Sequence, residues 1–483
     1  MSFNSLDFAI FLPIVFVLYW FVTNRSLRLQ NLFLIAVGYV FYGWWDWRFL
    51  ILLFSSSFID YWVGRWLGRE TDDRKRRWIL AISLTVNLGL LGFFKYFNFF
   101  AESLAGAFTL LGMPFEPTTL RVILPVGISF YTFQEMSYTI EVYRRKLDPT
   151  KDFIAFMAYV SFFPQLVAGP IERSTSLLPQ FFAKRSFDYE KALDGCRQIA
   201  WGLFKKIVIA DRCAIYANLI FDEAGSFSGS TLLLGAIFFA FQIYGDFSGY
   251  SDIAIGTARL FGFNLRRNFA FPYFSRDIAE FWRRWHISLT SWFRDYLYIP
   301  LGGNRGGVWK QVRNTFIIFL VSGLWHGANW TFLAWGALNA IYFLPILLSG
   351  RNRVNLDTVA ERRALPTLKE SGQMLLTFLL VVLGWIFFRA DTFSGALAYI
   401  ARIFSPSILS IPKFPDRIGA FYTLLILAGF VAAEWAGRRG QYAIEGLARL
   451  RRLPRWAALF ALVICTYWLG NFGQKIEFIY FQF

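Results

Sequence analysis

Histidine is scarce in this chain: only His286 and His326 carry an imidazole among 483 residues. The three cysteines, Cys196, Cys213 and Cys465, show no CxxC spacing, so the sequence predicts buried thiols rather than a disulfide framework or a zinc site. A Gly-rich phosphate loop, a GxSxG motif and a cluster of metal-ligand residues are also lacking. The sequence therefore predicts no bound metal, and the two histidines stand out as its rare reactive groups.

Charge is sparse as well, at 17% of the residues, whereas hydrophobic residues make up 56% and aromatic residues 20%. Apolar runs long enough to cross about 30 Å of hydrocarbon recur from end to end. They include Leu6–Val22, Trp78–Phe94, Leu232–Phe247, Thr315–Leu324 continuing past His326, Met374–Phe388, Phe421–Ala433 and Trp456–Leu469. We therefore expect an all-α, polytopic membrane protein with about eleven or twelve crossings, forming one domain over residues 1–483.

The distribution of charge predicts the topology. No basic residue precedes the first run, so we expect a retained helix rather than a cleavable signal. Basic residues cluster at Arg65–Arg77, Arg144–Lys151 and Arg438–Arg452, whereas the loops Ala101–Thr119 and Phe221–Thr231 carry only acidic charges. By the positive-inside rule the basic clusters are cytoplasmic and the acidic loops lie outside. The same clusters account for the net charge of +17 without a nucleic-acid partner.

Three segments interrupt the alternation of spans and loops. Phe153–Ser174 is apolar but broken by Pro164 and Gly169–Pro170, which predicts a re-entrant or interfacial segment rather than a plain span. The polar stretch Arg351–Glu370 predicts a cytoplasmic loop with a short amphipathic helix. Phe404–Arg417 contains three prolines, which break any helix.

The segment FWRRWHISLTSWFRDYLYIPLGG, residues 281–303, gathers charge, tryptophan and His286. Its apolar residues follow a spacing of four and three that predicts one face of a continuous helix. They are Trp285, Leu289, Trp292, Tyr296 and Ile299. Three arginines and an aspartate would each cost about 2.5 kcal/mol or more in hydrocarbon. The helix is therefore expected to dip into a polar cavity, or to lie on the surface as an amphipathic anchor.

His326 lies in an uncharged stretch, residues 315–348. A straight helix of that length would measure about 51 Å, too long for one crossing, so we expect the chain to turn near Gly327–Asn329 or to bend. A buried imidazole is neutral near pH 7 and can take a proton from a hydroxyl. A structural histidine bonded to a carbonyl is the alternative. Gly323 and Gly327 flank it without side chains, which would let a substrate approach.

Further polar residues interrupt apolar runs. They are Asp246, Ser248, Tyr250, Ser251 and Asp252, and earlier Gln134, Glu135 and Glu141. Asp246 and Asp252 are six residues apart, about 9 Å along a helix axis, and so do not form a close acid pair. Hydrogen bonds between helices and the lining of a substrate tunnel both explain these residues.

Six motifs in order cover nearly the whole chain. They are LPVGISFYTFQEMSYTIEVYR (Leu124–Arg144), SFFPQLVAGPI (Ser161–Ile171), YGDFSGYSDIAIG (Tyr244–Gly256), FWRRWHISLTSWFRDYLYIPLGGNRGG (Phe281–Gly307), GLWHGANWTFLAWG (Gly323–Gly336) and FIYFQF (Phe478–Phe483). Together they resemble the membrane-bound O-acyltransferase family, especially its bacterial polysaccharide branch, with a signature core over residues 124–345.

The resemblance implies transmembrane helices around a central tunnel, with His326 as the catalytic residue and His286 as a second signature position. The other candidates are Arg283 and Arg284 for the phosphates of the donor, and Trp325, Asn329, Asp246 and Tyr250 for the tunnel. Relatives often carry a further histidine after this motif, where the present chain has Asn339, so this chain has no third imidazole at that position.

The resemblance also implies an activity: an O-acetyltransferase of the bacterial inner membrane. It would move acetyl from cytoplasmic acetyl-CoA toward hydroxyls of an extracytoplasmic polysaccharide such as alginate. A periplasmic acetyltransferase or esterase-like partner is implied, and no permanently bound cofactor. D-alanyl or longer-chain acyl transfer to another envelope polymer stays open. A function from a different class also stays open, namely a proton-coupled permease with His326 and Asp246 as proton relays, although the sequence shows no inverted repeat.

Overall fold

The computed structural model describes residues 1–120, 123–472 and 476–479, and over these residues it is helical, without β-strands. The chain divides into two compact units, residues 1–195 with 254–266, and residues 196–253 with 267–483. The last four residues of the closing motif, 480–483, lie outside the described part.

Five helical stretches of the described chain are long and apolar enough to cross a membrane. They are Asp73–Leu110, Gly229–Leu260, Trp330–Leu348, Leu368–Arg389 and Arg417–Gly437. Shorter apolar helices cover Leu6–Val22, Leu27–Gly43 and Phe393–Ile403. The expectation of an all-α, polytopic membrane protein is confirmed. The eleven or twelve crossings and the single domain stay predictions.

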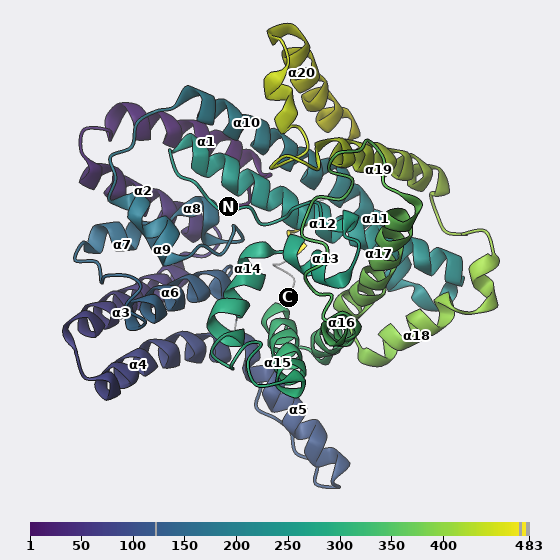
Figure 1. Cartoon of the computed structure of the whole chain (residues 1–483), viewed down its shortest axis with the longest axis horizontal. Helices are drawn as coiled ribbons and strands as arrows, with labels where there is room; N and C mark the ends of the chain where they lie inside the picture. The colour runs from purple at the N-terminus through teal and green to yellow at the C-terminus, as the bar shows by residue number, and fades with distance from the viewer. Residues whose placement is uncertain (121–122, 473–475, 480–483) are drawn as a thin grey trace. The chain divides into compact units, whose positions relative to one another are not determined.

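The first unit is built from the N-terminal helices. They are α1 (Leu6–Val17), α2 (Leu27–Gly43), α3 (Leu50–Arg69), α4 (Asp73–Leu91), α5 (Phe97–Leu110), α6 (Ile128–Tyr143), α7 (Phe153–Val160), α8 (Phe163–Leu166) and α9 (Ser174–Leu177). Helices α3, α4 and α6 pack side by side (Figure 1). Ser57 Oγ of α3 donates to Glu135 of α6 at 2.6 Å, and Asn87 Nδ2 of α4 donates to Asp60 of α3 at 2.7 Å. In this unit, buried polar groups therefore join helices.

Two loop predictions in this unit have different outcomes. The broken character of Phe153–Ser174 is confirmed, because the chain there forms only short, buried helices. The loop predicted over Ala101–Thr119 is wrong for its first half, since α5 continues to Leu110. The helix ends where Gly112 adopts a left-handed conformation, with φ of 77°.

Except for residues 189–195 and 254–260, the remaining helices belong to the second unit. Helix α10 (Tyr189–Phe204) leads into it, followed by α11 (Asp211–Asp222), α12 (Gly229–Leu260), α13 (Ile278–Arg284), α14 (Ile287–Phe293), α15 (Val308–His326), α16 (Trp330–Leu348), α17 (Leu368–Arg389), α18 (Phe393–Ile403), α19 (Arg417–Gly437) and α20 (Arg452–Leu469). Helix α12 has 32 residues, and its length of about 48 Å exceeds the thickness of the hydrocarbon core.

Helices α15 and α16 form a tight antiparallel hairpin (Figure 1). The turn predicted near Gly327–Asn329 is confirmed, because α15 ends at His326 and α16 begins at Trp330. Asn329 caps α16 by accepting a hydrogen bond from the backbone N–H of Thr331 at 3.0 Å.

The glycines beside His326 serve this hairpin. A Cβ at Gly323 would lie 2.2 Å from the carbonyl oxygen of Phe332, and one at Gly327 would lie 2.1 Å from the Phe332 ring. The expectation that these glycines open a path for substrate is therefore wrong, since the partner helix already fills that space.

Two further expectations are corrected. The polar stretch after α16 forms no helix before α17, which begins with a capping box between Thr367 and Glu370. Of the three free cysteines, Cys213 is buried as predicted, whereas Cys196 and Cys465 are exposed.

The irregular character predicted for Phe404–Arg417 is confirmed, with one 3-10 turn at Pro406–Leu409.

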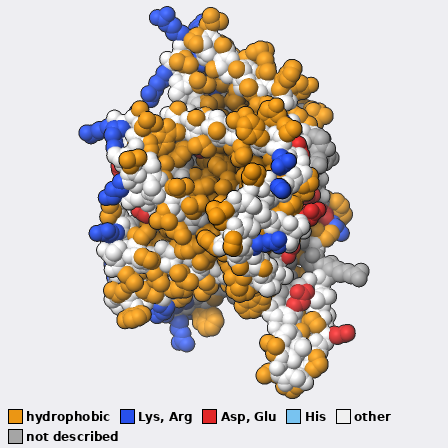
Figure 2. Space-filling model, turned by 90° about the vertical axis from the view of Figure 1, so that its right-hand side faces the viewer, with side chains coloured by type: hydrophobic (Ala, Val, Ile, Leu, Met, Phe, Trp, Pro, Cys, Tyr) orange, Lys and Arg blue, Asp and Glu red, His pale blue; other side chains and the backbone are white. Residues whose placement is uncertain are grey.

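The surface is strongly apolar, as expected of a protein that faces lipid. Figure 2 shows a face covered largely by hydrophobic side chains. Helix α20 has no buried residue, and Leu453, Trp456, Phe460 and Trp468 are all more than half exposed. Such patches mark contact with a membrane or a protein partner.

Candidate active site

His326 is the last residue of α15 and is 4% exposed. Its ring lies among aromatic side chains, with centroid distances of 5.0 Å to Trp325, 5.2 Å to Trp335 and 5.3 Å to Phe388. Helices α15, α16 and α17 thus enclose this imidazole in an apolar setting, which disfavours a positive charge on it.

His286 occupies the break between α13 and α14. The continuous helix predicted within the segment 281–303 is wrong, because His286 adopts a left-handed conformation with φ of 44° and ψ of 55°. Neighbouring backbone bonds impose the break: Ala270 donates to the carbonyl of Arg284, and Ile287 donates to that of Asn268, both at 2.9 Å. Such a conformation costs roughly 1–3 kcal/mol and is typical of functional sites.

The same break buries the His286 ring. It is 1% exposed, and its centroid lies 4.6 Å from the Phe247 ring and 5.9 Å from that of Trp325. Burial lowers the pKa of His286 to about 3, so this imidazole is neutral at physiological pH.

The two histidines meet at one cavity. Their ring centroids are 6.4 Å apart, and both line an inner cavity of about 60 Å³. The other residues of its wall are Trp282, Leu289, Thr290, Phe293, Ile318, Phe319 and Ser322. The two rarest side chains, from segments forty residues apart, therefore face the same small space.

A larger cavity of about 550 Å³ adjoins the inner one. The two share Trp282, Thr290, Ile318 and Phe319, which we call the neck. The wall of the outer cavity is mainly apolar but includes the arginines Arg283, Arg294 and Arg353. A ligand with an anionic part and a small reactive end would match this arrangement.

Comparison with known proteins decides the family. The chain matches the model of the membrane-bound O-acyltransferase family over residues 141–368. It is 42% identical over 409 residues to a Pseudomonas putida protein named probable alginate O-acetylase AlgI, an alignment that covers 84% of this chain and 80% of the relative. The chain belongs to the membrane-bound O-acyltransferase family.

Two other relatives show the breadth of this family. The chain is 36% identical over 416 residues to the peptidoglycan O-acetyltransferase of Helicobacter pylori, covering 80% of this chain and 76% of that protein. It is 30% identical over 275 residues to the teichoic acid D-alanyltransferase of Streptococcus thermophilus, an alignment that covers 50% of this chain and 62% of that protein. The protein is thus a membrane O-acyltransferase, and the permease alternative is set aside.

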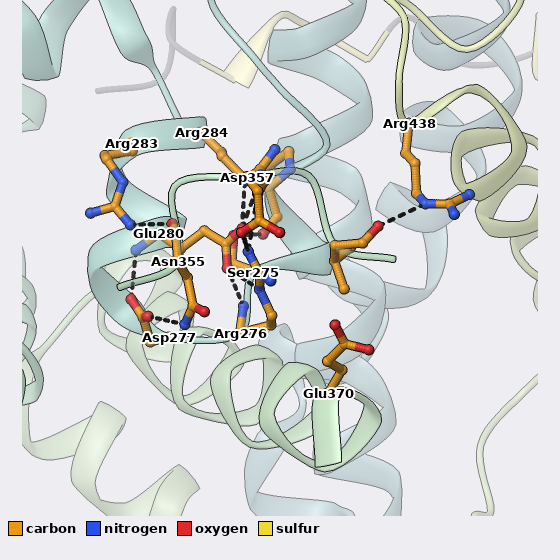
Figure 3. Close-up of polar contacts among 12 residues, drawn as sticks. Ser275, Arg276, Asp277, Glu280, Arg283, Arg284, Asn355, Asp357, Glu370 and Arg438 are labelled. Atoms are coloured by element: carbon orange, nitrogen blue, oxygen red, sulfur yellow. Dashed lines mark hydrogen bonds and ion pairs between the residues drawn. The ribbon is translucent and has the colours of Figure 1, made fainter. Parts of the chain in front are cut away.

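The two arginines proposed for the donor have different environments in this O-acyltransferase. Arg283 lines the outer cavity and donates to the carbonyls of Asn352 and Asn355, both at 2.7 Å. Arg284 pairs with Glu280 at 2.9 Å and donates to the Asp357 carbonyl at 2.7 Å, and it lines neither cavity (Figure 3).

These contacts explain why the polar loop after α16 forms no helix. Its carbonyls accept hydrogen bonds from arginines of other segments (Figure 3). Arg276 donates to the Asp357 carbonyl at 3.0 Å, and Arg438 donates to the Val359 carbonyl at 3.0 Å. Because those carbonyls are already used, the loop lies against α13 as turns and bends rather than as a helix, and it brings Arg353 to the outer cavity.

The other predicted site residues line neither cavity. Trp325 is 3% exposed and packs against both histidines. Asn329 caps α16 and also donates to the Asp391 carbonyl at 3.2 Å. The Tyr250 ring is 4.4 Å from that of Phe478. Neither cavity contacts Asp246.

Asp246 belongs to a buried ion cluster. Lys206 Nζ is 2.8 Å from both Asp246 and Asp211, and all three side chains are at most 5% exposed. The second oxygen of Asp246 accepts from the Ile479 backbone N–H at 2.7 Å, and Lys206 donates to the Ile476 carbonyl at 3.2 Å. The cluster therefore docks residues 476–479 onto α12.

A π-helical turn, Lys205–Ala210, directs two consecutive lysines inward. Lys205 is also 3% exposed, and it pairs with Asp252 at 2.6 Å and Ser248 at 2.9 Å. In a regular α-helix adjacent residues point about 100° apart, so the wide turn helps both ammonium groups to reach α12. For Asp246, Ser248 and Asp252 the structure thus shows polar contacts between helices.

Sequence reasoning missed most of the cavity wall. Trp282, Phe319 and Phe293 look like ordinary apolar residues, and Arg353 lies in a loop seventy residues beyond Arg283. Only Thr290 and Ser322 could have been selected from the sequence, because each is a polar residue four positions from one of the two histidines. Among the described residues, no three His, Cys, Asp or Glu side chains are grouped as metal ligands.

Proposed function

We propose that the protein transfers an acetyl group from cytoplasmic acetyl-CoA to hydroxyl groups of an extracytoplasmic polysaccharide such as alginate. The observation that carries this proposal is the pair of buried imidazoles on one cavity that continues into a cavity with basic residues. The names of the Pseudomonas putida and Helicobacter pylori relatives support acetyl as the group transferred.

In the proposed reaction His326 is the general base. Its imidazole takes the proton of the acceptor hydroxyl as the oxygen attacks the thioester carbonyl carbon. A C–O bond forms, the C–S bond breaks, and the proton passes from the imidazolium to the departing thiolate. His286, 6.4 Å away, positions the donor by a hydrogen bond rather than by moving the proton.

The outer cavity provides the donor site in this proposal. Arg283, Arg294 and Arg353 bind the phosphates, because guanidinium groups match phosphate oxygens in geometry and charge. Arg284 supports the site indirectly, since its contacts to Glu280 and Asp357 hold α13 and the loop together. Trp325 packs against both imidazoles and keeps them in place.

We place the enzyme in the bacterial inner membrane, with the basic clusters in the cytoplasm and a periplasmic acetyltransferase or esterase-like partner on the other side. Cysteine labelling tests this orientation in a background lacking the three native thiols. Glu116→Cys, in an exposed loop, should react with a membrane-impermeant reagent in intact cells. Lys75→Cys should react only after permeabilisation, and the reverse pattern would overturn the topology.

The central test is a His326→Ala replacement in the strain that carries this chain. We expect envelope polysaccharide to lose its ester-linked acetate while the membrane level of the protein is unchanged. Mild base releases the esterified groups, so acetate and D-alanine can be measured in the same sample. Normal acetate in the variant would refute the role of His326, and release of D-alanine from wild type would favour the aminoacyl alternative.

A further inference from the structure

The inner cavity is much smaller than the outer one, at about 60 Å³ against about 550 Å³. A cavity of this size suits a short group such as the methyl and carbonyl of an acetyl chain, whereas a four-carbon butyryl chain carries two further methylenes.

The wall of this cavity resists expansion. The Trp282 ring packs edge-on against Phe319 at 5.5 Å and against Trp335 at 5.5 Å, and Trp335 is 2% exposed. Leu289 and Phe293, which also line the cavity, are 3% and 2% exposed. Since closely packed interiors yield little, a longer chain would force these rings off their preferred rotamers.

The chemistry of the wall is selective as well. Five of the nine lining residues are apolar, the polar ones are Thr290, Ser322 and the two histidines, and none is acidic. An aminoacyl group would place an ammonium here without a carboxylate to pair with, which is strongly unfavourable in a buried site.

We propose that the inner cavity is an acyl pocket that accepts a two-carbon, uncharged acyl group, and that Trp282 and Phe319 in the neck limit the size of the group that it takes. This inference rests on the proposed function, because it takes the histidine cavity as the place where the thioester reacts. It adds residues that determine which acyl group is used.

The test is competition between acetyl-CoA and butyryl-CoA on the purified full-length protein. The ratio of kcat/KM values does not depend on how much of the preparation is active, so partial misfolding does not affect it. One methylene is worth roughly 10–200-fold in a hydrophobic site. With two, we expect wild type to prefer acetyl by at least about a hundredfold.

Phe319→Ala and Trp282→Leu should each raise the relative use of butyryl by about tenfold or more. Phe319→Leu keeps most of the packing and should shift the ratio less, in the same direction. Phe343→Leu is the matched control, because Phe343 lines only the outer cavity and should leave the ratio unchanged. Isobutyryl-CoA and D-alanyl-CoA, similar in shape, separate size from charge: Phe319→Ala should use only the former.

The outcomes are distinguishable. A wild type that uses no CoA thioester refutes the proposed function itself. A wild type that uses acetyl-CoA and butyryl-CoA equally refutes the acyl pocket alone. So does an unchanged ratio in the three neck variants.

Discussion

Replacement of Lys206 by methionine would remove the cation from the buried cluster with Asp211 and Asp246. Methionine is similar in length, so the main change is electrostatic. Two carboxylates, each 2.8 Å from the lost ammonium and at most 5% exposed, would then face one another without a counter-charge. Breaking one buried ion pair in this way typically costs about 3–5 kcal/mol, and here two contacts are lost.

Neutralising the other side should cost far less. The cluster has one positive and two negative groups, so Asp246→Asn makes it neutral and retains an oxygen that can accept from the Ile479 backbone N–H. We expect a loss of about 0.5–1.5 kcal/mol, the net value of one hydrogen bond. In the triple variant Lys206→Met, Asp211→Asn, Asp246→Asn, no charge is left unpaired.

The assay is thermal stability of the detergent-solubilised protein, followed by the amount that stays monodisperse after heating. The expected order of midpoints is wild type first, then Asp246→Asn, then the triple variant, with Lys206→Met clearly the lowest. If Lys206→Met melts with wild type, or if the triple variant is no more stable than Lys206→Met, the electrostatic account of the cluster is wrong.

Two further predictions concern the loop after α16 and the α15–α16 hairpin. Hydrogen bonds from Arg276 hold the pKa of Asp357 below its usual value. Their contribution to the stability of the fold is therefore present at neutral pH and is lost as the pH falls through the lowered pKa. Between roughly pH 5 and pH 3, the wild-type protein should thus lose more thermal stability than the Asp357→Asn variant. Gly323→Ala places a Cβ against the Phe332 carbonyl and should destabilise the protein by about 1–3 kcal/mol and reduce activity. Gly372→Ala, a helical control with open space around it, should do neither.

The apolar runs were sufficient to predict much of the fold. The cores of α12, α17 and α19 coincide with them, and the excessive length of the uncharged run revealed the turn after His326. These features depend on the local sequence alone, because the thickness of the hydrocarbon core sets how many consecutive apolar residues one span needs.

The break at His286 could not be predicted in this way. The spacing of Trp285, Leu289 and Trp292 fits a continuous helix, yet backbone groups of residues 268–270 take the hydrogen bonds that would continue it. Such competition depends on tertiary packing and leaves no periodic signal. The approach of Arg353 to the outer cavity has the same origin.

The candidate site followed the same division. His286 and His326 could be selected because imidazole is rare in the chain and ionisable groups are costly in a membrane. Trp282 and Phe319 could not, since they are two of many aromatic residues and only the packing of α13 against α15 gives them a place in the neck.

The role of His326 is tested most directly by comparing His326→Asn with His286→Asn as purified proteins. Acetyl transfer is measured over a range of acetyl-CoA concentrations, with thermal midpoints as the check on folding. Asparagine can still hydrogen-bond but is no base, so His326→Asn should lower kcat by about 10²–10⁴-fold. His286→Asn should lose about tenfold, mainly through a higher KM for the donor. An inactive His286→Asn beside an active His326→Asn would contradict the assignment of the base.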